Sequence, residues 1–259
     1  MGIPAFDIIG DVAIVEIEGG ENEKGIAKLI VKNHPHIKTV LRKMGGREGK
    51  YRVRKFKKIL GKETETEHKE HGCRFRMDVA KVYFSPREAT ERQRIAEQVK
   101  RGESVMVMFA GIGSFPVIVA KKNPKVGQIY GIEINPHAFK YMVENVRINK
   151  VGHKVMPVLG DVKKVAKDYS GLCDRVVMPL PKEGYRYLPE AFQCLKKKGT
   201  IHFYYYEHER DLFTKALETV RKTSEKMNKR VKIINKRKVL PYGPRVWKIC
   251  IDFEVCDSK

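Results

Sequence analysis

The chain has few cysteines and no long apolar segment. Its five cysteines, among 259 residues, are scattered, with no C-x-x-C pair and no histidine at metal-ligand spacing. This pattern argues against a disulfide framework and predicts no metal site. No apolar run reaches the roughly 18 residues that a membrane span needs, and no signal peptide opens the chain. We therefore expect a soluble, cytoplasmic protein with reduced thiols and no membrane contact.

Acidic residues are scarce relative to basic ones. The chain carries 53 Lys and Arg against 31 Asp and Glu, a net charge of +22. Such an excess favours an anionic partner, with nucleic acid ahead of an acidic membrane surface. At 42% hydrophobic residues the chain can still build a full core, so its polarity does not imply disorder.

The basic residues gather in two clusters. Residues 42–58 hold nine Lys or Arg against one acid, interleaved with Tyr51 and Phe56. That pattern suits a phosphate track with base-stacking side chains, as single-stranded RNA loops require. Residues 221–238 hold nine more against Glu225. This second cluster fits equally a nucleic-acid surface and a plain solvated helix and strand.

The pattern of apolar residues divides the chain into two parts. Residues 1–78 mix predicted strands and a helix, and we assign them to a small α+β domain that binds RNA and supports catalysis. Residues 79–259 alternate strand and helix and end in an antiparallel pair. The second part therefore predicts an α/β, Rossmann-like fold, with a mostly parallel sheet and helices on both faces.

A glycine loop follows the apolar strand "SVMVMFAG" (104–111). A dinucleotide fingerprint requires a third glycine, whose place Pro116 takes here, and a triphosphate loop requires Gly-Lys-Ser/Thr, which is missing. Gly111 and Gly113 still allow a ligand close to the backbone, and the next helix can begin beside a carboxylate. These absences argue against a dehydrogenase and an NTPase.

Two acids follow at the ends of the next strands. Glu133 ends the strand in "YGIEIN" and lies 22 residues after Gly111, and Asp161 follows the strand in "VLGD". Glu133 can accept from both hydroxyls of an adenosine ribose, and Asp161 can read the adenine amino group. The glycine loop, Glu133 and Asp161 follow three successive strands and outline an adenosine pocket. Because the loop lacks pyrophosphate contacts, they predict S-adenosylmethionine as the ligand.

Four motifs carry a family resemblance: "AKVYFSPR" (80–87), "FAGIGSF" (109–115), "GIEINPHAF" (131–139) and "DRVVMPLPK" (174–182). Together they resemble the archaeal branch of the tRNA (guanine-37-N1)-methyltransferases, class I enzymes that use S-adenosylmethionine. The resemblance covers nearly the whole chain and begins at the family's second domain. It implies methylation of N1 of guanosine 37 in the tRNA anticodon loop, and it implies no protein partner.

The resemblance also implies roles for single residues. The family's catalytic arginine matches Arg52 in "YRVRKF", and its general base matches Glu91 in "ATERQRI". Glu91 would take the proton of guanine N1, and Arg52 would stabilise the charge that develops on O6. The resemblance places Tyr83 and Arg87 beside cofactor and substrate. Phe109 and Pro181, with Gly111, Gly113, Glu133 and Asp161, complete the predicted cofactor site.

The chain departs from the family pattern at two positions. The acid that often precedes the glycine loop is Val107, and the asparagine of the "NLP" motif is Pro179. We assign Pro179 to the catalytic site, where it removes a polar reader of the target guanine. One archaeal branch methylates both guanosine N1 and carbon 7 of the tricyclic base 4-demethylwyosine, and "MPLP" is what such a branch would need.

Two other functions stay open at this point. Wyosine-pathway enzymes resemble the chain in the SPR element and the glycine loop, but they transfer an aminocarboxypropyl group from the same cofactor. A non-catalytic RNA-binding protein with a vestigial cofactor fold is the alternative from another class. Cofactor binding would separate the RNA-binding module from both enzymes, and mass analysis of the modified tRNA would separate the two enzymes.

Overall fold

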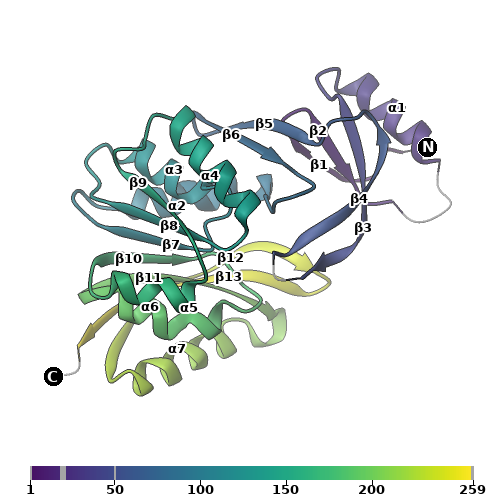
Figure 1. Cartoon of the computed structure of the whole chain (residues 1–259). Helices are drawn as coiled ribbons and strands as arrows, with labels where there is room; N and C mark the ends of the chain where they lie inside the picture. The colour runs from purple at the N-terminus through teal and green to yellow at the C-terminus, as the bar shows by residue number, and fades with distance from the viewer. Residues whose placement is uncertain (1, 18–21, 50, 258–259) are drawn as a thin grey trace.

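The computed structural model describes residues 2–17, 22–49 and 51–257 (Figure 1). Near the N-terminus, strands of the order β1-β2-β3-β4 form a small sheet. Helix α1 connects the parallel pair β2 and β3, and it packs the apolar side chains of Ile26, Ala27 and Ile30 on the sheet. The elements are β1 (Phe6–Ile9), β2 (Val12–Val15), α1 (Glu23–Asn33), β3 (Thr39–Glu48) and β4 (Val53–Leu60).

A hairpin of β5 (Glu65–Glu70) and β6 (Cys73–Asp78) joins the two parts of the chain. Its side chains Phe75 and Met77 are buried in the same core as the helices that follow. Asn145 of helix α4 (Pro136–Ile148) and Asn149, which follows the end of that helix, bond to backbone groups of Arg76 and Arg74 on β6. The hairpin thus packs on the larger part, and the domain boundary after residue 78 stays a prediction.

The larger part is built on a seven-stranded sheet of order β12-β13-β11-β10-β7-β8-β9. The five strands from β9 to β11 pair in parallel, and β13 runs antiparallel between β11 and β12. The strands are β7 (Val105–Met108), β8 (Ile129–Glu133), β9 (Val155–Leu159), β10 (Cys173–Met178), β11 (Leu195–His208), β12 (Lys229–Gly243) and β13 (Val246–Asp257).

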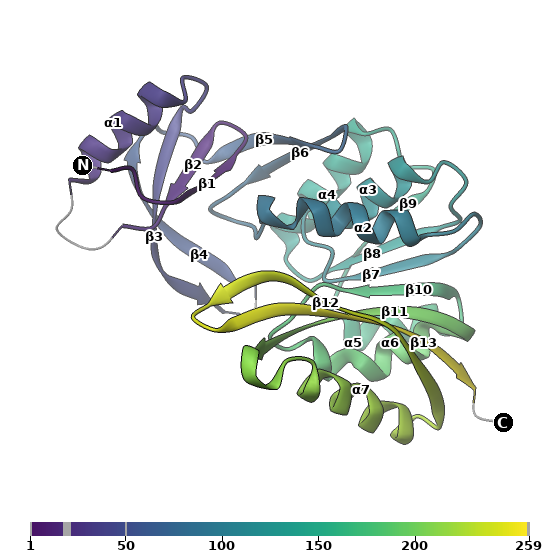
Figure 2. The same ribbon diagram turned by 180° about the vertical axis from the view of Figure 1, so that it is seen from behind.

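Helices cover both faces of this sheet (Figures 1 and 2). Alternate residues of β7 explain why: Val105 and Val107 enter one core, and Met106 and Met108 enter the other. The predicted Rossmann-like fold is confirmed. The helices are α2 (Ala89–Gln98), α3 (Ser114–Lys122) and α4 (Pro136–Ile148) on one face, and α5 (Val162–Val165), α6 (Leu188–Cys194) and α7 (Thr214–Lys226) on the other.

Short 3₁₀ segments complete the chain: η1 (Pro86–Glu88), η2 (Ala166–Tyr169), η3 (Gly184–Tyr187) and η4 (Glu209–Asp211). The small sheet matters for the site because the β3–β4 hairpin extends beyond it, toward the turn between β12 and β13 (Figure 2). No helix within the described ranges is long and apolar enough to span a membrane.

Candidate active site

The main pocket opens at the carboxyl ends of the parallel strands, where open α/β sheets place their ligands. One wall comes from the loops that follow β7, β8, β9 and β10, and the opposite wall from the β3–β4 hairpin, η1 and β13. Eight residues predicted for the site line this pocket: Arg52, Tyr83, Phe109, Gly111, Glu133, Asp161, Pro179 and Pro181. Residues far apart in sequence are thus brought to one cavity.

The loop after β7 has a left-handed backbone where it faces the pocket. Gly111 has a φ of +58°, which glycine adopts at little cost. Phe109 also has a φ of 58°, an unusual value for a bulky residue, and its ring packs edge-on against Tyr187 with centroids 4.9 Å apart. Strain of this kind concentrates where a loop is shaped for a ligand.

Gly113 serves packing and does not line the pocket. A Cβ at this position would lie 2.7 Å from Cγ of Met142 on α4, and its φ of +84° is left-handed. Gly131 on β8 provides the other close approach, since its Cβ would lie 3.3 Å from Cγ of Pro116. The space that a third glycine gives in a dinucleotide fold is here provided from the neighbouring strand.

Glu133 is buried and holds the glycine loop. Its carboxylate accepts from the backbone N–H of Gly111 at 2.7 Å and from that of Asn135 at 2.8 Å. Burial raises the pKa of Glu133, and these N–H groups offset part of the increase. Glu133 lines the pocket, and a carboxylate has enough lone pairs to accept from the two hydroxyls of a ribose as well. Asp161 lines the same wall and accepts from the N–H of Lys163 at 3.1 Å.

The opposite end of the pocket receives the tip of the basic hairpin. Arg52 has a φ of 53° and donates its backbone N–H to Gly49 at 3.1 Å, so a tight turn directs the tip. Within the described part of the chain its guanidinium has no hydrogen bond or ion pair. Tyr51, 45% exposed, lies beside it, and Pro179 lines the floor. This end offers a free cation and an aromatic surface to an incoming base.

Two predicted residues lie away from the pocket wall. Arg87 points to β1, where its Nε lies 2.6 Å from Oδ1 of Asp7. Glu91 is 3% exposed, and its carboxylate accepts from the Tyr204 hydroxyl at 2.6 Å and from Arg94 at 2.7 and 2.9 Å. Their predicted roles beside cofactor and substrate therefore stay predictions that the geometry does not itself support.

Sequence reasoning missed a buried ion pair on the pocket wall. Nζ of Lys248 lies 2.9 Å from Oε2 of Glu88, and the Tyr83 hydroxyl donates to Oε1 of Glu88 at 3.0 Å. Lys248 is 2% and Glu88 5% exposed, and both line the pocket. Burial raises the pKa of Glu88, but Lys248, with help from Arg92 and the Tyr83 hydroxyl, keeps the pKa below its usual value. The only signal in the sequence was an acid directly after "SPR".

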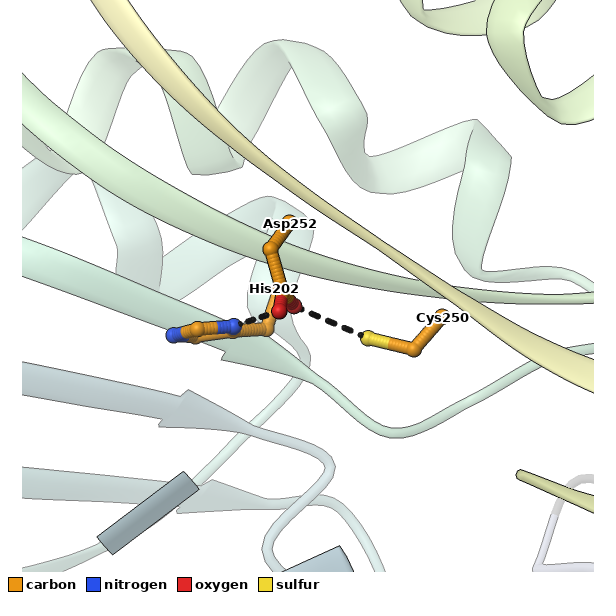
Figure 3. A group of neighbouring side chains, drawn as sticks. All are labelled: His202, Cys250 and Asp252. Carbon is orange, nitrogen blue, oxygen red and sulfur yellow. Dashed lines mark hydrogen bonds and ion pairs between the residues drawn. The ribbon is translucent and has the colours of Figure 1, made fainter. Parts of the chain in front are cut away.

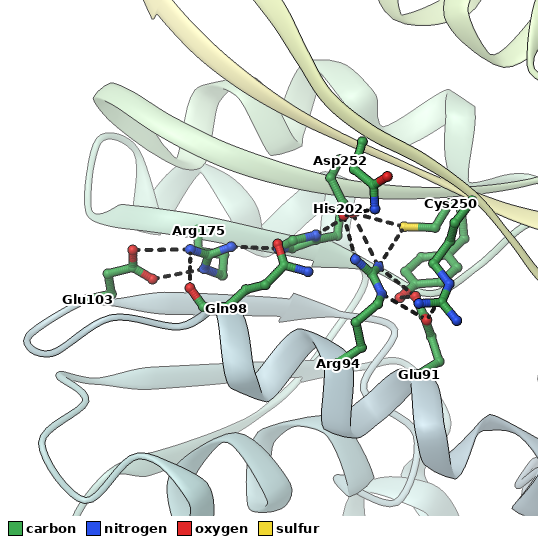
Figure 4. A network of polar contacts seen from close by, with 11 residues as sticks. Glu91, Arg94, Gln98, Glu103, Arg175, His202, Cys250 and Asp252 are labelled. Atoms are coloured by element: carbon green, nitrogen blue, oxygen red, sulfur yellow. Dashed lines mark hydrogen bonds and ion pairs between the residues drawn. The ribbon is translucent and has the colours of Figure 1, made fainter.

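A second polar cluster is buried between α2 and strands β11 and β13, next to Glu91. His202, Cys250 and Asp252 bring ligand-type atoms within 4.8 Å of one another (Figure 3). Arg94 donates to Asp252 at 2.5 Å, and Arg175 donates to Nε2 of His202 at 2.7 Å (Figure 4). Two guanidinium groups thus occupy the lone pairs that a cation would use, so the chemistry is that of a structural network.

Acid is expected to weaken this network through His202. Because Arg175 can only donate, Nε2 of His202 accepts and Nδ1 carries the proton given to Asp252 at 2.6 Å. Burial, aided by Arg175 and Arg94, lowers the pKa of His202, although Asp252 opposes this. The unfolded chain then binds a proton that the folded chain refuses, so stability should fall as the pH drops below about 6.5.

Thermal unfolding at pH 7.5, 6.5 and 5.5 measures this effect. The unaltered protein should lose more stability over this range than His202→Gln, which has no ring to titrate. His153→Gln, a change outside the network, is the control and should follow the unaltered curve. Equal slopes for all three proteins would contradict the assignment.

Comparison with known proteins agrees with this geometry. Residues 66–234 match the TRM5/TYW2 methyltransferase domain, and residues 4–64 match the TYW2 N-terminal domain. The chain is 42% identical to tRNA (guanine(37)-N(1))-methyltransferase Trm5b of Pyrococcus abyssi, over 97% of this chain and 74% of that protein. It is 36% identical to tRNA(Phe) (4-demethylwyosine(37)-C(7)) aminocarboxypropyltransferase of Methanocaldococcus jannaschii, over 97% and 98%.

A third relative combines two substrates in its name. It is tRNA (guanine(37)-N(1))/4-demethylwyosine(37)-methyltransferase Taw22 of Nanoarchaeum equitans, 32% identical over 83% of this chain and 88% of that protein. Among solved structures, wild-type Trm5b of Pyrococcus abyssi superposes with a TM-score of 0.89 at 40% identity, over 98% of this chain and 76% of that one.

Two further structures contain ligands. The complex of aTrm5 with tRNALeu has a TM-score of 0.85 at 36% identity, covering 96% of this chain and 71% of that one. Methanocaldococcus jannaschii TYW2 in complex with AdoMet has a TM-score of 0.76 at 31% identity, covering 98% and 100%. With matches over most of its length in both sequence and fold, the chain belongs to the TRM5/TYW2 methyltransferase family.

Proposed function

We propose that the chain is a tRNA methyltransferase of the cytoplasm that transfers the methyl group of S-adenosylmethionine to N1 of guanosine 37. One observation carries the proposal: a single pocket has the buried acid Glu133 on one wall and Arg52, from the tip of the basic hairpin, on the other. The first is suited to an adenosine ribose, the second to a base in an RNA loop. The names of the Pyrococcus and Nanoarchaeum relatives support the same reaction.

The chemistry asks little of the protein beyond position and charge. The sulfonium of the cofactor supplies an activated methyl group, so holding guanine N1 in line with it provides much of the rate. Guanine N1 carries a proton at neutral pH, and its loss places negative charge on O6. The Arg52 guanidinium can donate to O6, and a carboxylate must accept the proton.

Glu91 remains our proposal for that carboxylate on the strength of the family resemblance. Its Oε1 accepts from both Tyr204 and Arg94, and its Oε2 accepts from Arg94 and lies 3.6 Å from Nε of Arg237. To receive the proton, the buried carboxylate would therefore have to turn toward the pocket, which it does not line. A shift of the first turn of α2 when tRNA binds would be sufficient. Glu88, one turn earlier, already faces the pocket.

Mass analysis of modified tRNA tests the proposal. A tRNA transcript with G37 is incubated with the protein and S-adenosylmethionine, then digested to nucleosides. The proposal expects 1-methylguanosine at position 37, and a transcript with A37 as the control should stay unmodified. A protein that binds the cofactor by calorimetry but modifies neither tRNA would be an RNA-binding module and would contradict the proposal.

Aminocarboxypropyl transfer is the second candidate, favoured by one observation. The Methanocaldococcus aminocarboxypropyltransferase matches over 98% of its length, and residues 4–64 match the TYW2 N-terminal domain. Against it, the "MPLP" stretch after β10 sides with methyl transfer. The same mass analysis, on tRNA that carries 4-demethylwyosine, distinguishes the much heavier aminocarboxypropyl group from a methyl group.

Pro179 leads to a prediction about substrate range. It lines the pocket and has neither a side-chain amide nor a backbone N–H, so it cannot pair with the edge of guanine as an asparagine can. We propose that the enzyme therefore also methylates carbon 7 of 4-demethylwyosine. Pro179→Asn should lower the rate on the tricyclic base by about tenfold or more relative to guanosine. This factor is the contribution of about one hydrogen bond between the asparagine side chain and the edge of guanine.

Single-turnover rates on tRNA with each base measure this preference. Pro157→Asn, a change on β9 that does not line the pocket, is the matched control and should leave the ratio of rates unchanged. If the unaltered enzyme leaves the tricyclic base unmethylated, the dual specificity is wrong, whatever the effect of the substitution.

A further inference from the structure

The Glu88–Lys248 pair is the feature of the pocket that neither the resemblance nor the proposed reaction explains. Both side chains are more than nine-tenths buried, yet both line the cavity. Among the described residues, each of the Glu88 oxygens has one hydrogen-bond or ion-pair partner, the Tyr83 hydroxyl or the Lys248 ammonium, and keeps a lone pair. An ionised carboxylate that is only an acceptor needs a donor from whatever fills the cavity.

The order of strands shows which ligand lies next to the pair. Glu133 ends β8, and Lys248 lies near the start of β13, opposite Tyr206 of β11. Four strand spacings separate β8 from β13, about 19 Å at about 4.8 Å each. Pro179, at the end of β10, lies between them. If Glu133 holds the ribose of the cofactor, the methyl group lies near Pro179, in the middle of the pocket. The Glu88–Lys248 pair then lies on the far side, where the base that accepts the methyl group would bind.

We propose that Glu88, oriented by Lys248 and Tyr83, accepts a hydrogen bond from the exocyclic amino group of the target guanine and so selects guanine over hypoxanthine. The inference rests on the proposed function. The amino group is the donor that distinguishes guanine from hypoxanthine, which is otherwise identical along that edge. Lys248 acts as a positioning residue. Its ammonium holds Oε2 of Glu88 and the Tyr83 hydroxyl holds Oε1, so the remaining lone pairs of the carboxylate are left for the base.

The arrangement also explains why the chain retains a buried charged pair. Replacing such a pair by apolar residues is often neutral or stabilising, so stability alone gives no reason to keep it. Nζ of Lys248 lies 4.9 Å from the ring centroid of Tyr204, which further restricts where the ammonium can move. A site that hydrogen-bonds a substrate N–H discriminates strongly against the analogue that lacks it, because the buried acceptor is then left unpaired.

The test compares tRNA transcripts with G37 and with inosine 37. The unaltered enzyme should prefer G37 by about 10- to 100-fold in kcat/KM, the range for a hydrogen bond to a charged group. The double variant E88M/K248M leaves no orphaned charge, and it should reduce the preference to about threefold or less. E88Q, which removes the charge and keeps the shape, should fall between the two.

Two controls separate specificity from general damage. E103Q breaks another ion pair, that of Glu103 with the buried Arg175 near the amino ends of β7 and β10, and should keep the full G37 preference. Affinity for S-adenosylmethionine, by calorimetry, should stay within about threefold in all variants. A tenfold loss in E88Q would instead place the pair on the amino-acid end of the cofactor and overturn the inference.

The remaining outcomes also decide the question. A double variant that keeps the full preference for G37 would show that the pair is structural. Equal rates of the unaltered enzyme on both transcripts would overturn this inference but leave the proposed function standing. No transfer to either transcript would overturn the proposed function, and the inference with it. If the double variant does not fold, E88Q decides by itself.

Discussion

Glu133→Ala is expected to abolish measurable binding of S-adenosylmethionine. The carboxylate is 8% exposed, and it holds the N–H groups of Gly111 and Asn135 while facing the pocket. Two charge-assisted bonds to a ribose, at about 1.5–3 kcal/mol each, correspond to a loss of about 10²–10⁴ in affinity. Loss of the loop anchor adds to this, because Gly111 is then free to leave its left-handed conformation.

Calorimetric titration with S-adenosylmethionine measures the loss. Glu144→Ala, on α4 and outside the pocket lining, is the matched control and should bind like the unaltered protein. Since burial raises the pKa of Glu133, the ionised form that accepts from the ribose is lost earlier on acidification than for an ordinary glutamate. Affinity should therefore begin to fall above the usual glutamate range. Wild-type affinity in Glu133→Ala would refute the cofactor site.

Arg52→Ala is expected to reduce methyl transfer by about 10²–10³ while sparing cofactor binding. The magnitude is that of removing one preorganised donor from a developing oxyanion. The Arg52 side chain lies at the hairpin tip on the acceptor side, away from Glu133, so calorimetry with S-adenosylmethionine should detect no change. Arg52→Lys should recover little, because an ammonium lacks the planar fork of the guanidinium.

Single-turnover rates on G37 tRNA measure this change in the chemical step, free of product release. Arg54→Ala, two residues further along and in β4, is the control for a general loss of RNA contact and should raise KM with little effect on the single-turnover rate at saturation. If Arg52→Ala also changes only KM, Arg52 is one more phosphate contact and its catalytic role is wrong.

Glu91→Ala belongs in the same assay but needs a second readout. We expect it to spare cofactor binding and to lower the rate of transfer. Because Glu91 holds Tyr204 and Arg94, its removal leaves a buried guanidinium less well paired, and stability should fall as well. A lower rate that persists well below the unfolding temperature supports a role in the reaction. A wild-type rate would contradict that role.

Features set by local rules could be predicted from the sequence. The alternation of apolar strands and amphipathic helices predicted a parallel sheet, and parallel strands bring their carboxyl ends to one edge. Glu133 and Asp161 follow neighbouring strands, so their presence in one pocket followed from their positions in the chain. The same reasoning predicts Gly111 at that edge, because a loop directly after a buried strand must face it, and Gly111 lines the pocket.

Only the tertiary structure decided which of two acids near the start of α2 reaches the pocket. Glu88 and Glu91 are three residues apart, and either could have faced the cavity; the packing of α2 turned Glu91 toward Tyr204 and left Glu88 on the wall. Lys248 reaches Glu88, 160 residues earlier in the chain, because β13 inserts antiparallel beside β11. Periodicity reports the conformation of a segment, whereas the direction of a side chain depends on every element packed around it.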